Sequence, residues 1–202
     1  MKLIEQNKDK VIQLIRESNW IEGERENALL GKFFPEHLVA IKNMFERGVS
    51  SVADILAIHS DFCEHLSDRT LFEEWKRQYN APPSMSWEGF CINIKGKIRS
   101  HPVVVGGYRP ETDKKKIQQG LEKIVNSKFF FRNPYLTYCE FETIHPFADF
   151  NGRTGRALWL YVFVTSRGFM PESFLNQFHY SALSNYRWVE GYKRFGNMEL
   201  PF

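Results

Sequence analysis

The spacing of apolar residues predicts a mainly α-helical protein. Over most of the chain, apolar side chains recur three and four residues apart, which places them on one face of a helix. The segments expected to be helical are 3–22, 33–45, 51–66, 71–79, 117–125, 138–144, 152–166 and 181–195. No apolar stretch approaches the roughly 20 residues needed to cross a membrane, so we expect a soluble bundle of helices.

One segment has the pattern of a strand rather than of a helix. Residues 96–107 contain the β-branched run Val103, Val104 and Val105, with glycines at both ends of the segment. Such a run favours a short strand or hairpin whose edge is exposed enough to pair with another strand. Earlier in the chain, the sequence Ala-Pro-Pro-Ser-Met-Ser at 81–86 breaks regular structure and predicts a loop.

Length and composition favour a single folded domain in the cytoplasm. The chain has 202 residues, of which 43% are hydrophobic and 18 are phenylalanine, enough for a substantial core. Its N-terminus lacks the apolar stretch of a secretory signal. Cys63, Cys91 and Cys139 are widely spaced and odd in number, which is typical of reduced thiols. The net charge of +3 is modest, and the lysine run 114–116 is read as solvated surface, so a nucleic-acid partner is not expected.

Residues 145–156, His-Pro-Phe-Ala-Asp-Phe-Asn-Gly-Arg-Thr-Gly-Arg, join two of the expected helices. Pro146 lacks an amide hydrogen and disfavours a helical conformation at His145, so the first helix should stop near His145. Asn151 is a good N-cap residue and the apolar repeat resumes after it, so the second helix should begin near Asn151 or Gly152. The unpaired amides and the positive dipole end of that helix would attract an anion such as phosphate.

The same segment carries side chains that phosphate chemistry uses. Gly152 lets a ligand approach the backbone closely, and Arg153 and Arg156 add positive charge from neighbouring faces of the helix. Asp149 is an oxygen ligand suited to Mg²⁺, which shares one or two carboxylates with substrate phosphates. A histidine has an ordinary pKa in the working range of a general base, so His145 is the candidate base. The plain alternative is a helix-turn-helix with a capping asparagine and solvated arginines.

This segment resembles the motif of the Fic (filamentation induced by cAMP) family, H-x-F-x-(D/E)-G-N-G-R-x-x-R. The matching positions are His145, Phe147, Asp149, Asn151, Gly152, Arg153 and Arg156. Phe150 departs from the pattern, because it stands where the family has its first glycine and where the neighbouring Doc branch has alanine. The resemblance implies a mainly α fold, a Fic-fold helical bundle over residues 31–202 with a small β-hairpin flap beside the active site. Phe147 is expected to point into the core and fix the loop.

A second resemblance lies at the end of the first expected helix. The stretch from Ser18 to Gly23, Ser-Asn-Trp-Ile-Glu-Gly, is similar to the inhibitory motif (S/T)-x-x-x-E-(G/N) of Fic proteins that carry it N-terminally. Ser18 and Glu22 share one helix face. In related proteins such a glutamate pairs with the second arginine of the motif, here Arg156, and occupies the place of the nucleotide's terminal phosphate. Residues 1–30 are therefore expected to form an inhibitory region; the alternative is a helix that ends at Gly23 with a solvated Glu22.

The function that the resemblance implies is adenylylation, the transfer of AMP from ATP to a Ser, Thr or Tyr hydroxyl of a target protein, the chain itself included. His145 would take the hydroxyl proton, and Asp149 would hold Mg²⁺ on the phosphates. The nucleotide would be bound by Phe150, Asn151, Gly152, Arg153 and Arg156. An extended target segment would pair with the flap at Val103, Val104 and Val105. Glu22 would restrain the transfer, or position water to remove AMP again; the sequence leaves this choice open, as it does the formation of a homodimer.

Three other functions stay open from the sequence. A Doc-like kinase would use the same site with ATP turned around, although that branch has lysine where this chain has Gly152. A binding or regulatory module would result if Phe150 spoiled the seat of the nucleotide, although the retained carboxylate and arginines would then have no use. A metal phosphohydrolase built on His145 and Asp149 would need a further His/Asp cluster to complete its metal site.

Overall fold

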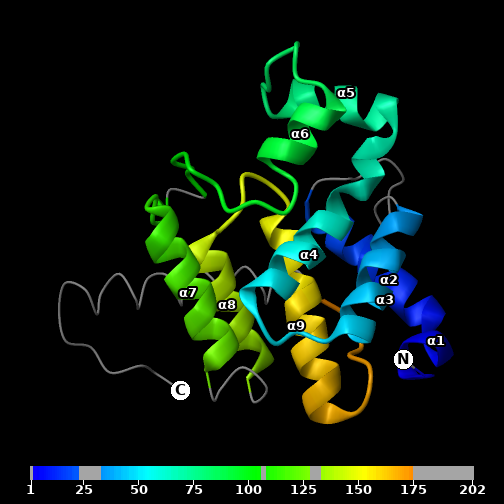
Figure 1. The fold of residues 1–202 in the computed structure, drawn as a ribbon. Helices are drawn as coiled ribbons and strands as arrows, with labels where there is room; N and C mark the ends of the chain where they lie inside the picture. Colours follow the sequence, from blue (N-terminus) through cyan, green and yellow to red (C-terminus); the bar gives the residue numbers. More distant parts are fainter. Residues whose placement is uncertain (1, 23–32, 106–107, 128–132, 175–202) are drawn as a thin grey trace.

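The computed structural model describes residues 2–22, 33–105, 108–127 and 133–174, and this part of the chain is built of helices (Figure 1). Within these residues no strand is assigned, and no helix is both long and apolar enough to cross a membrane. The helices are α1 (Lys2–Gln6), α2 (Lys8–Ile21), α3 (Pro35–Arg47), α4 (Val52–Phe62), the 3₁₀ helix η1 (Cys63–Ser67), α5 (Arg69–Gln78), α6 (Trp87–Asn93), α7 (Lys114–Asn126), α8 (Pro134–Ile144) and α9 (Asn151–Arg167).

Helix α9 lies at the centre of the described structure. Figure 1 shows it, in yellow and orange, between α8 on one side and α4 and α3 on the other, and it contacts α8, α4, α3 and α2. Residues 157–162, Ala-Leu-Trp-Leu-Tyr-Val, are all buried, as expected for a helix that is apolar on every face and surrounded by protein. The motif therefore opens a helix that the core holds from several sides.

Most of the helices expected from the sequence are confirmed, with ends shifted by a few residues. Ser51 begins α4 through a capping box, in which its hydroxyl and the carboxylate of Asp54 each accept a hydrogen bond from the other's backbone amide. Helix α9 ends at a glycine, Gly168, whose φ of 77° is a left-handed conformation that glycine adopts without steric cost. The expected helix over 181–195 lies outside the described residues, as does Gly23.

The sequence pattern does not indicate α6, which follows directly after the predicted loop at 81–86. Ser86 caps its N-terminus by accepting a hydrogen bond from the backbone amide of Gly89. Phe90 is buried, and its ring packs edge-on against the rings of Phe72 and Trp75. A helix of seven residues is too short to display a helical repeat, and its stability comes from tertiary packing rather than from propensity.

The predicted β-hairpin flap is not seen in the described residues. Val103 and Val104 are in no strand, and Val105 pairs with Tyr108 in a single antiparallel bridge. β-branched residues favour a strand only where a neighbouring strand and a buried face are available. Here the segment is instead bonded to the turn after α8, because the backbone amide of Arg99 donates to the carbonyl of Pro146 (2.9 Å).

His59 is a buried core histidine, as its place on the apolar face of its helix predicts. Its Nδ1 accepts from the backbone amide of Gly96 (2.9 Å), so Nε2 carries the proton and donates to the carbonyl of Asp149 (3.2 Å). The ring also stacks on that of Phe147, with the centroids 3.8 Å apart. His59 thus supports the motif loop from the core. Burial lowers the pKa of its ring to about 3.

Two further buried histidines link the N-terminal helix to the core. Nε2 of His37 on α3 lies 3.1 Å from Nδ1 of His65 in η1, and the amide of Asn19 on α2 lies 3.3 Å from Nδ1 of His37. Burial lowers the pKa of His37 well below its ordinary value and that of His65 to about 3, and the nearby charge of Arg153 lowers both further. These rings are therefore neutral in the folded chain at neutral pH.

The buried histidines predict that the protein loses stability in mild acid. The pKa of each ring is lower in the folded chain than the ordinary 6.5, so between pH 6.5 and about 3 the unfolded chain binds more protons, and stability falls as the pH drops through this window. The free energy of unfolding, measured with urea, should fall between pH 7.5 and pH 5.5 by about 1.4 kcal/mol for each such histidine. His101→Gln, at a histidine that is exposed rather than buried, is the control and should leave this loss unchanged. Equal stability at the two pH values would contradict the prediction.

Candidate active site

The motif loop joins α8 to α9 through two residues of unusual backbone conformation. Helix α8 ends at Ile144, and His145 follows with a φ of 48°; α9 begins at Asn151, directly after Phe150 with a φ of 60°. The predicted helix ends are confirmed. Residues other than glycine seldom take positive φ, and they keep it only where surrounding contacts hold them in place. The contacts of this loop therefore decide where its side chains point.

The side chain of Asn151 fixes the loop. Its carbonyl oxygen accepts from the backbone amide of Phe147, and its amide group donates to the carbonyl of Phe147, both at 2.9 Å. The prediction that Asn151 is the N-cap is wrong, because Phe150 occupies that position and makes no side-chain cap bond. Phe147 itself is buried in the core, as predicted. The amides of the first turn of α9 thus receive no capping side chain from Phe150, which suits them to bind an anion.

Arg99 holds the end of α8, a role that the sequence pattern does not indicate. Its guanidinium donates to four backbone carbonyls, those of His145 (2.7 Å), Ile144 (3.4 Å), His101 (2.9 Å) and Glu111 (2.5 Å). A cation at the C-terminus of a helix satisfies carbonyls that have no partner within the helix. Arg99 thereby fixes the backbone of His145, and it brings the segment of the predicted flap to the site.

Asp149 lies in a shell of aromatic residues. One carboxylate oxygen accepts from the indole N–H of Trp75 (2.8 Å), and the other accepts from the backbone amide of Phe150 (2.6 Å). Burial raises the pKa of the Tyr79 hydroxyl, and the nearby charge of Asp149 raises it further. Each carboxylate oxygen offers about two lone pairs, so Asp149 could still act as one of the one or two carboxylates that hold Mg²⁺ beside water and substrate phosphates. No cluster of three or more His, Cys, Asp or Glu side chains suited to a metal ion occurs in the described part of the chain.

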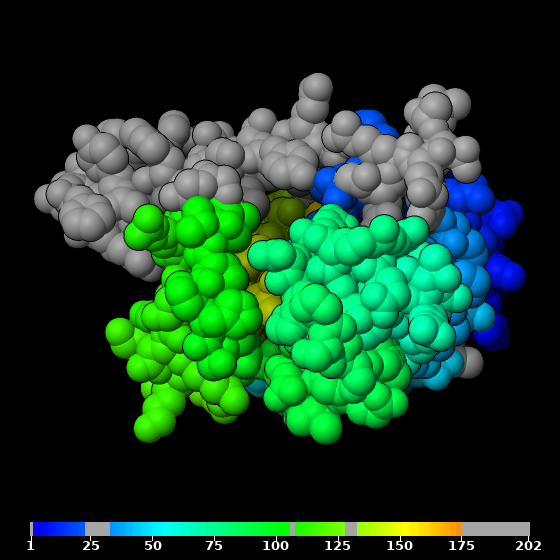
Figure 2. Space-filling view, turned by 90° about the horizontal axis from the view of Figure 1, so that it is seen from above, coloured from blue at the N-terminus to red at the C-terminus, as the bar shows by residue number. Residues whose placement is uncertain are grey.

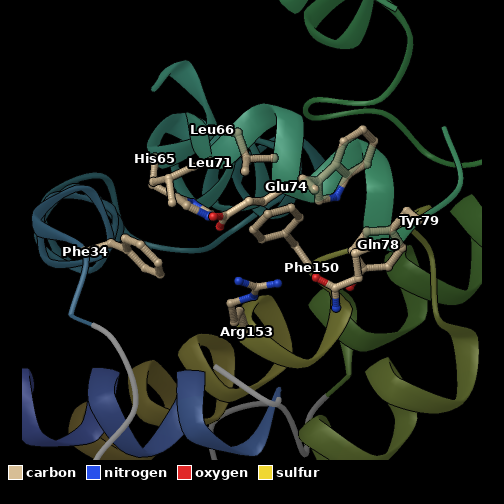
Figure 3. A pocket seen from close by; sticks show the side chains of 10 residues that line it. Phe34, His65, Leu66, Leu71, Glu74, Gln78, Tyr79, Phe150 and Arg153 are labelled. Atoms are coloured by element: carbon tan, nitrogen blue, oxygen red, sulfur yellow. The ribbon is translucent and has the colours of Figure 1, made fainter. Parts of the chain in front are cut away.

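Arg153 lies under the ring of Phe150, with its guanidinium carbon 4.0 Å from the ring centroid. Figure 3 shows Arg153 reaching up from α9 toward Phe150, with Glu74 and Gln78 of α5 and the following Tyr79 around them. These residues line a small cavity of about 50 Å³. A cation over an aromatic face is stabilised electrostatically, so the ring of Phe150 orients one of the two motif arginines.

Arg156 is bound by the N-terminal helix. Its Nε donates to the hydroxyl of Ser18 (2.8 Å), and one terminal nitrogen donates to the carbonyl of Ser18 (3.2 Å) and to the carboxylate of Glu22. Burial raises the pKa of Glu22, but Arg156, with Arg153 and His145 beyond it, outweighs this and holds the pKa below its ordinary value. Residues from opposite ends of the described chain are thus joined at the first turns of α9.

Two comparisons with known proteins agree with this geometry. The sequence pattern of the Fic/DOC family matches residues 49–163, which is more than half of the chain. The chain belongs to the Fic/DOC family. Its fold is similar to the crystal structure of a Fic family protein from Desulfovibrio desulfuricans G20, with a TM-score of 0.55 at 18% identity. That match covers 95% of this chain and 61% of the other. A comparison with curated proteins gave no match.

Within this Fic domain the motif residues and the described residues of the predicted inhibitory stretch come together. The motif residues from His145 to Arg156 surround the start of α9, and Ser18 and Glu22 reach them from α2. The flap valines form no strand there, and Gly23 lies outside the described residues. Figure 2 shows the yellow segment that contains the motif at the base of a hollow between the green residues of α7 and the blue-green residues of α5.

Phe150, the departure from the Fic motif, takes a backbone conformation that glycine would take freely. Its ring is buried, and it packs edge-on against His59 and His65 as well as over Arg153. The ring of Phe150 therefore fills core space beside the loop. Its packing contacts hold the positive φ that a glycine would adopt without steric cost. The comparison of motifs shows that Phe150 departs from the family pattern, but it does not show which way the ring of Phe150 points.

The contacts of Arg156 predict that Ser18 stabilises the fold. Replacing Ser18 with alanine removes the hydroxyl that accepts from a buried guanidinium, and a hydrogen bond to a charged group contributes about 1.5–3 kcal/mol. Urea unfolding of Ser18→Ala should show a loss of this order. Ser67→Ala, at an exposed serine in η1, is the control and should change stability little; losses of equal size in both variants would contradict the prediction.

Proposed function

We propose that this Fic domain is a protein adenylyltransferase, which moves AMP from ATP to a hydroxyl group of a protein. The observation that carries the proposal is the place of the Glu22 carboxylate, which lies against Gly152 and Arg156 at the start of α9. Arg156, Arg153 and His145 all act electrostatically on this carboxylate. An anion is thus stabilised there by two arginines and a helix N-terminus, and a nucleotide phosphate has the same requirements.

In the proposed reaction, His145 accepts the proton of the target hydroxyl as that oxygen attacks the α-phosphorus of ATP. The new O–P bond forms as the bond to pyrophosphate breaks, so AMP is added to the target. The amides of the first turn of α9, with Arg153 and Arg156, would hold the phosphates, since positioning and charge stabilisation supply most of the catalysis in such transfers. Asp149 would hold Mg²⁺, which neutralises part of the phosphate charge when bound.

Gly152 favours AMP transfer over the Doc-like kinase reaction. A Cβ atom at this position would lie 2.0 Å from the carboxylate oxygen of Glu22. The lysine that the Doc branch has here could not coexist with Glu22 in its present position. This chain therefore combines a glutamate at the anion site with the glycine that makes room for it.

Glu22 is expected to restrain the transfer. The guanidinium of Arg156 is almost fully buried, with 2% of its side chain exposed, and its bonds to Ser18 and Glu22 occupy it. It cannot hold Glu22 and a terminal phosphate at once. ATP would then bind in the productive orientation only after the end of α2 releases Arg156.

These roles predict opposite effects for two substitutions. With ATP, Mg²⁺ and a cell lysate, Glu22→Gly should raise AMP transfer on the order of 10- to 100-fold, the range of typical coupling between sites. His145→Ala should lower the transfer by about 100- to 10,000-fold, because it removes the general base. The measurement is the mass added to each modified protein. Asp9→Gly, at an exposed acidic residue of the same helix α2, is the matched control and should behave as wild type.

The added mass also separates the alternatives. An added phosphate in place of AMP would establish the kinase reaction. No addition by either wild type or Glu22→Gly would overturn the transferase proposal and favour a binding module. Transfer by His145→Ala at the wild-type rate would overturn the mechanism, and equal transfer by wild type and Glu22→Gly would overturn the inhibitory role.

A further inference from the structure

A buried carboxylate lies one helical turn before the proposed base. Glu142 and His145 are three residues apart at the end of α8, and residues at this spacing are neighbours on a helix surface. Oε2 of Glu142 lies 3.6 Å from Nδ1 of His145, and only 6% of the Glu142 side chain is exposed. Carboxylates are rarely buried in proteins, so the place of this one beside the base calls for a physical reason.

The packing of α8 against α9 leaves room for this carboxylate. A Cβ atom at Gly155 would lie 2.6 Å from Oε1 of Glu142 and 2.9 Å from the ring of Phe141. Any larger residue at Gly155 would therefore push Glu142 aside. The charge of Glu142 also acts on Arg156 and on Tyr138, which puts it within electrostatic reach of the anion site.

The two nitrogens of His145 have different surroundings. Nδ1 is buried and has no hydrogen-bond partner among the residues that the structure describes, and Oε2 of Glu142 lies 3.6 Å from it. Nε2 is then the nitrogen left to take a proton from a substrate. A neutral imidazole can accept at Nε2 only if Nδ1 carries the hydrogen, and the group that accepts from Nδ1 sets this tautomer.

We infer that Glu142 is the positioning residue of His145. It accepts a hydrogen bond from the Nδ1–H group, keeps the lone pair on Nε2, and stabilises the imidazolium that forms when Nε2 takes the proton of the target hydroxyl. The distance of 3.6 Å closes to a hydrogen bond by a small movement of either side chain, and catalytic hydrogen bonds are often long before substrate binds. The inference rests on the proposed role of His145 as the base, and it extends that role to a carboxylate–histidine pair.

Glu142→Gln tests the charge of this residue, because glutamine keeps the shape of the side chain. In the Glu22→Gly background it should lower kcat for AMP transfer about 10- to 100-fold, a part of the total effect of a general base, with KM for ATP unchanged. The acid limb of the pH–rate profile should move to lower pH, because a neutral neighbour stabilises the imidazolium less. Glu140→Gln, on the same helix, is the control. Loss of stability without a change in the profile would mean that Glu142 is only structural, and it would overturn the inference.

A second measurement does not depend on transferase activity. Nitrogen chemical shifts of the His145 ring, assigned by comparison with His145→Ala, report its tautomer and its pKa. In the Glu22→Gly protein we expect hydrogen on Nδ1, and a pKa that falls when Glu142→Gln is added; Arg156 and Tyr138 face the pair in both proteins. The same tautomer and pKa in both would overturn the inference. If Glu22→Gly transfers no AMP, the proposed function fails, and these spectra still decide the role of Glu142.

Discussion

The buried guanidinium of Arg156 is the constraint on which the rest of the site depends. A cation enclosed by protein is costly unless it is paired and hydrogen-bonded. Here α2 meets both needs, through the hydroxyl and carbonyl of Ser18 and the carboxylate of Glu22. This contact joins α2 to the start of α9, so a change at either end of it is expected to affect both the stability of the fold and the anion site.

Hydrogen bonds to its backbone hold the loop before α9 in a conformation that its residues do not favour by themselves. His145 and Phe150 both have positive φ, which costs free energy that other contacts must offset. The side-chain amide of Asn151 and the guanidinium of Arg99 form hydrogen bonds to the loop backbone, as does the buried ring of His59. With the backbone fixed in this way, the side chains of the site are placed before any ligand arrives, which is what efficient positioning requires.

Inhibition and substrate binding use the same physical property in the proposed function. The first turn of α9 and its two arginines attract negative charge, whether it is carried by a carboxylate of the chain or by a phosphate. Gly152 leaves the space in which the Glu22 carboxylate lies. The carboxylate of Glu22 therefore already occupies the anion site within the chain itself. In the proposed function, a nucleotide would have to displace this contact before transfer could occur.

The sequence by itself determined the helical repeat, the two helices that flank the motif and the family, because these depend on local spacing or on a motif in fixed register. The pairing of Glu22 with Arg156 was implied only by a resemblance to related proteins, and the contact itself is seen in the tertiary structure. Tertiary structure alone decided the rest. Arg99 acts on residues more than 40 positions away, α6 depends on aromatic packing, and the valine run lacks the neighbouring strand that its pattern requires. Asn151 looks like a helix cap in the sequence, yet its side chain bonds to Phe147 instead. Each of these outcomes is set by contacts between distant segments, which short-range patterns do not contain.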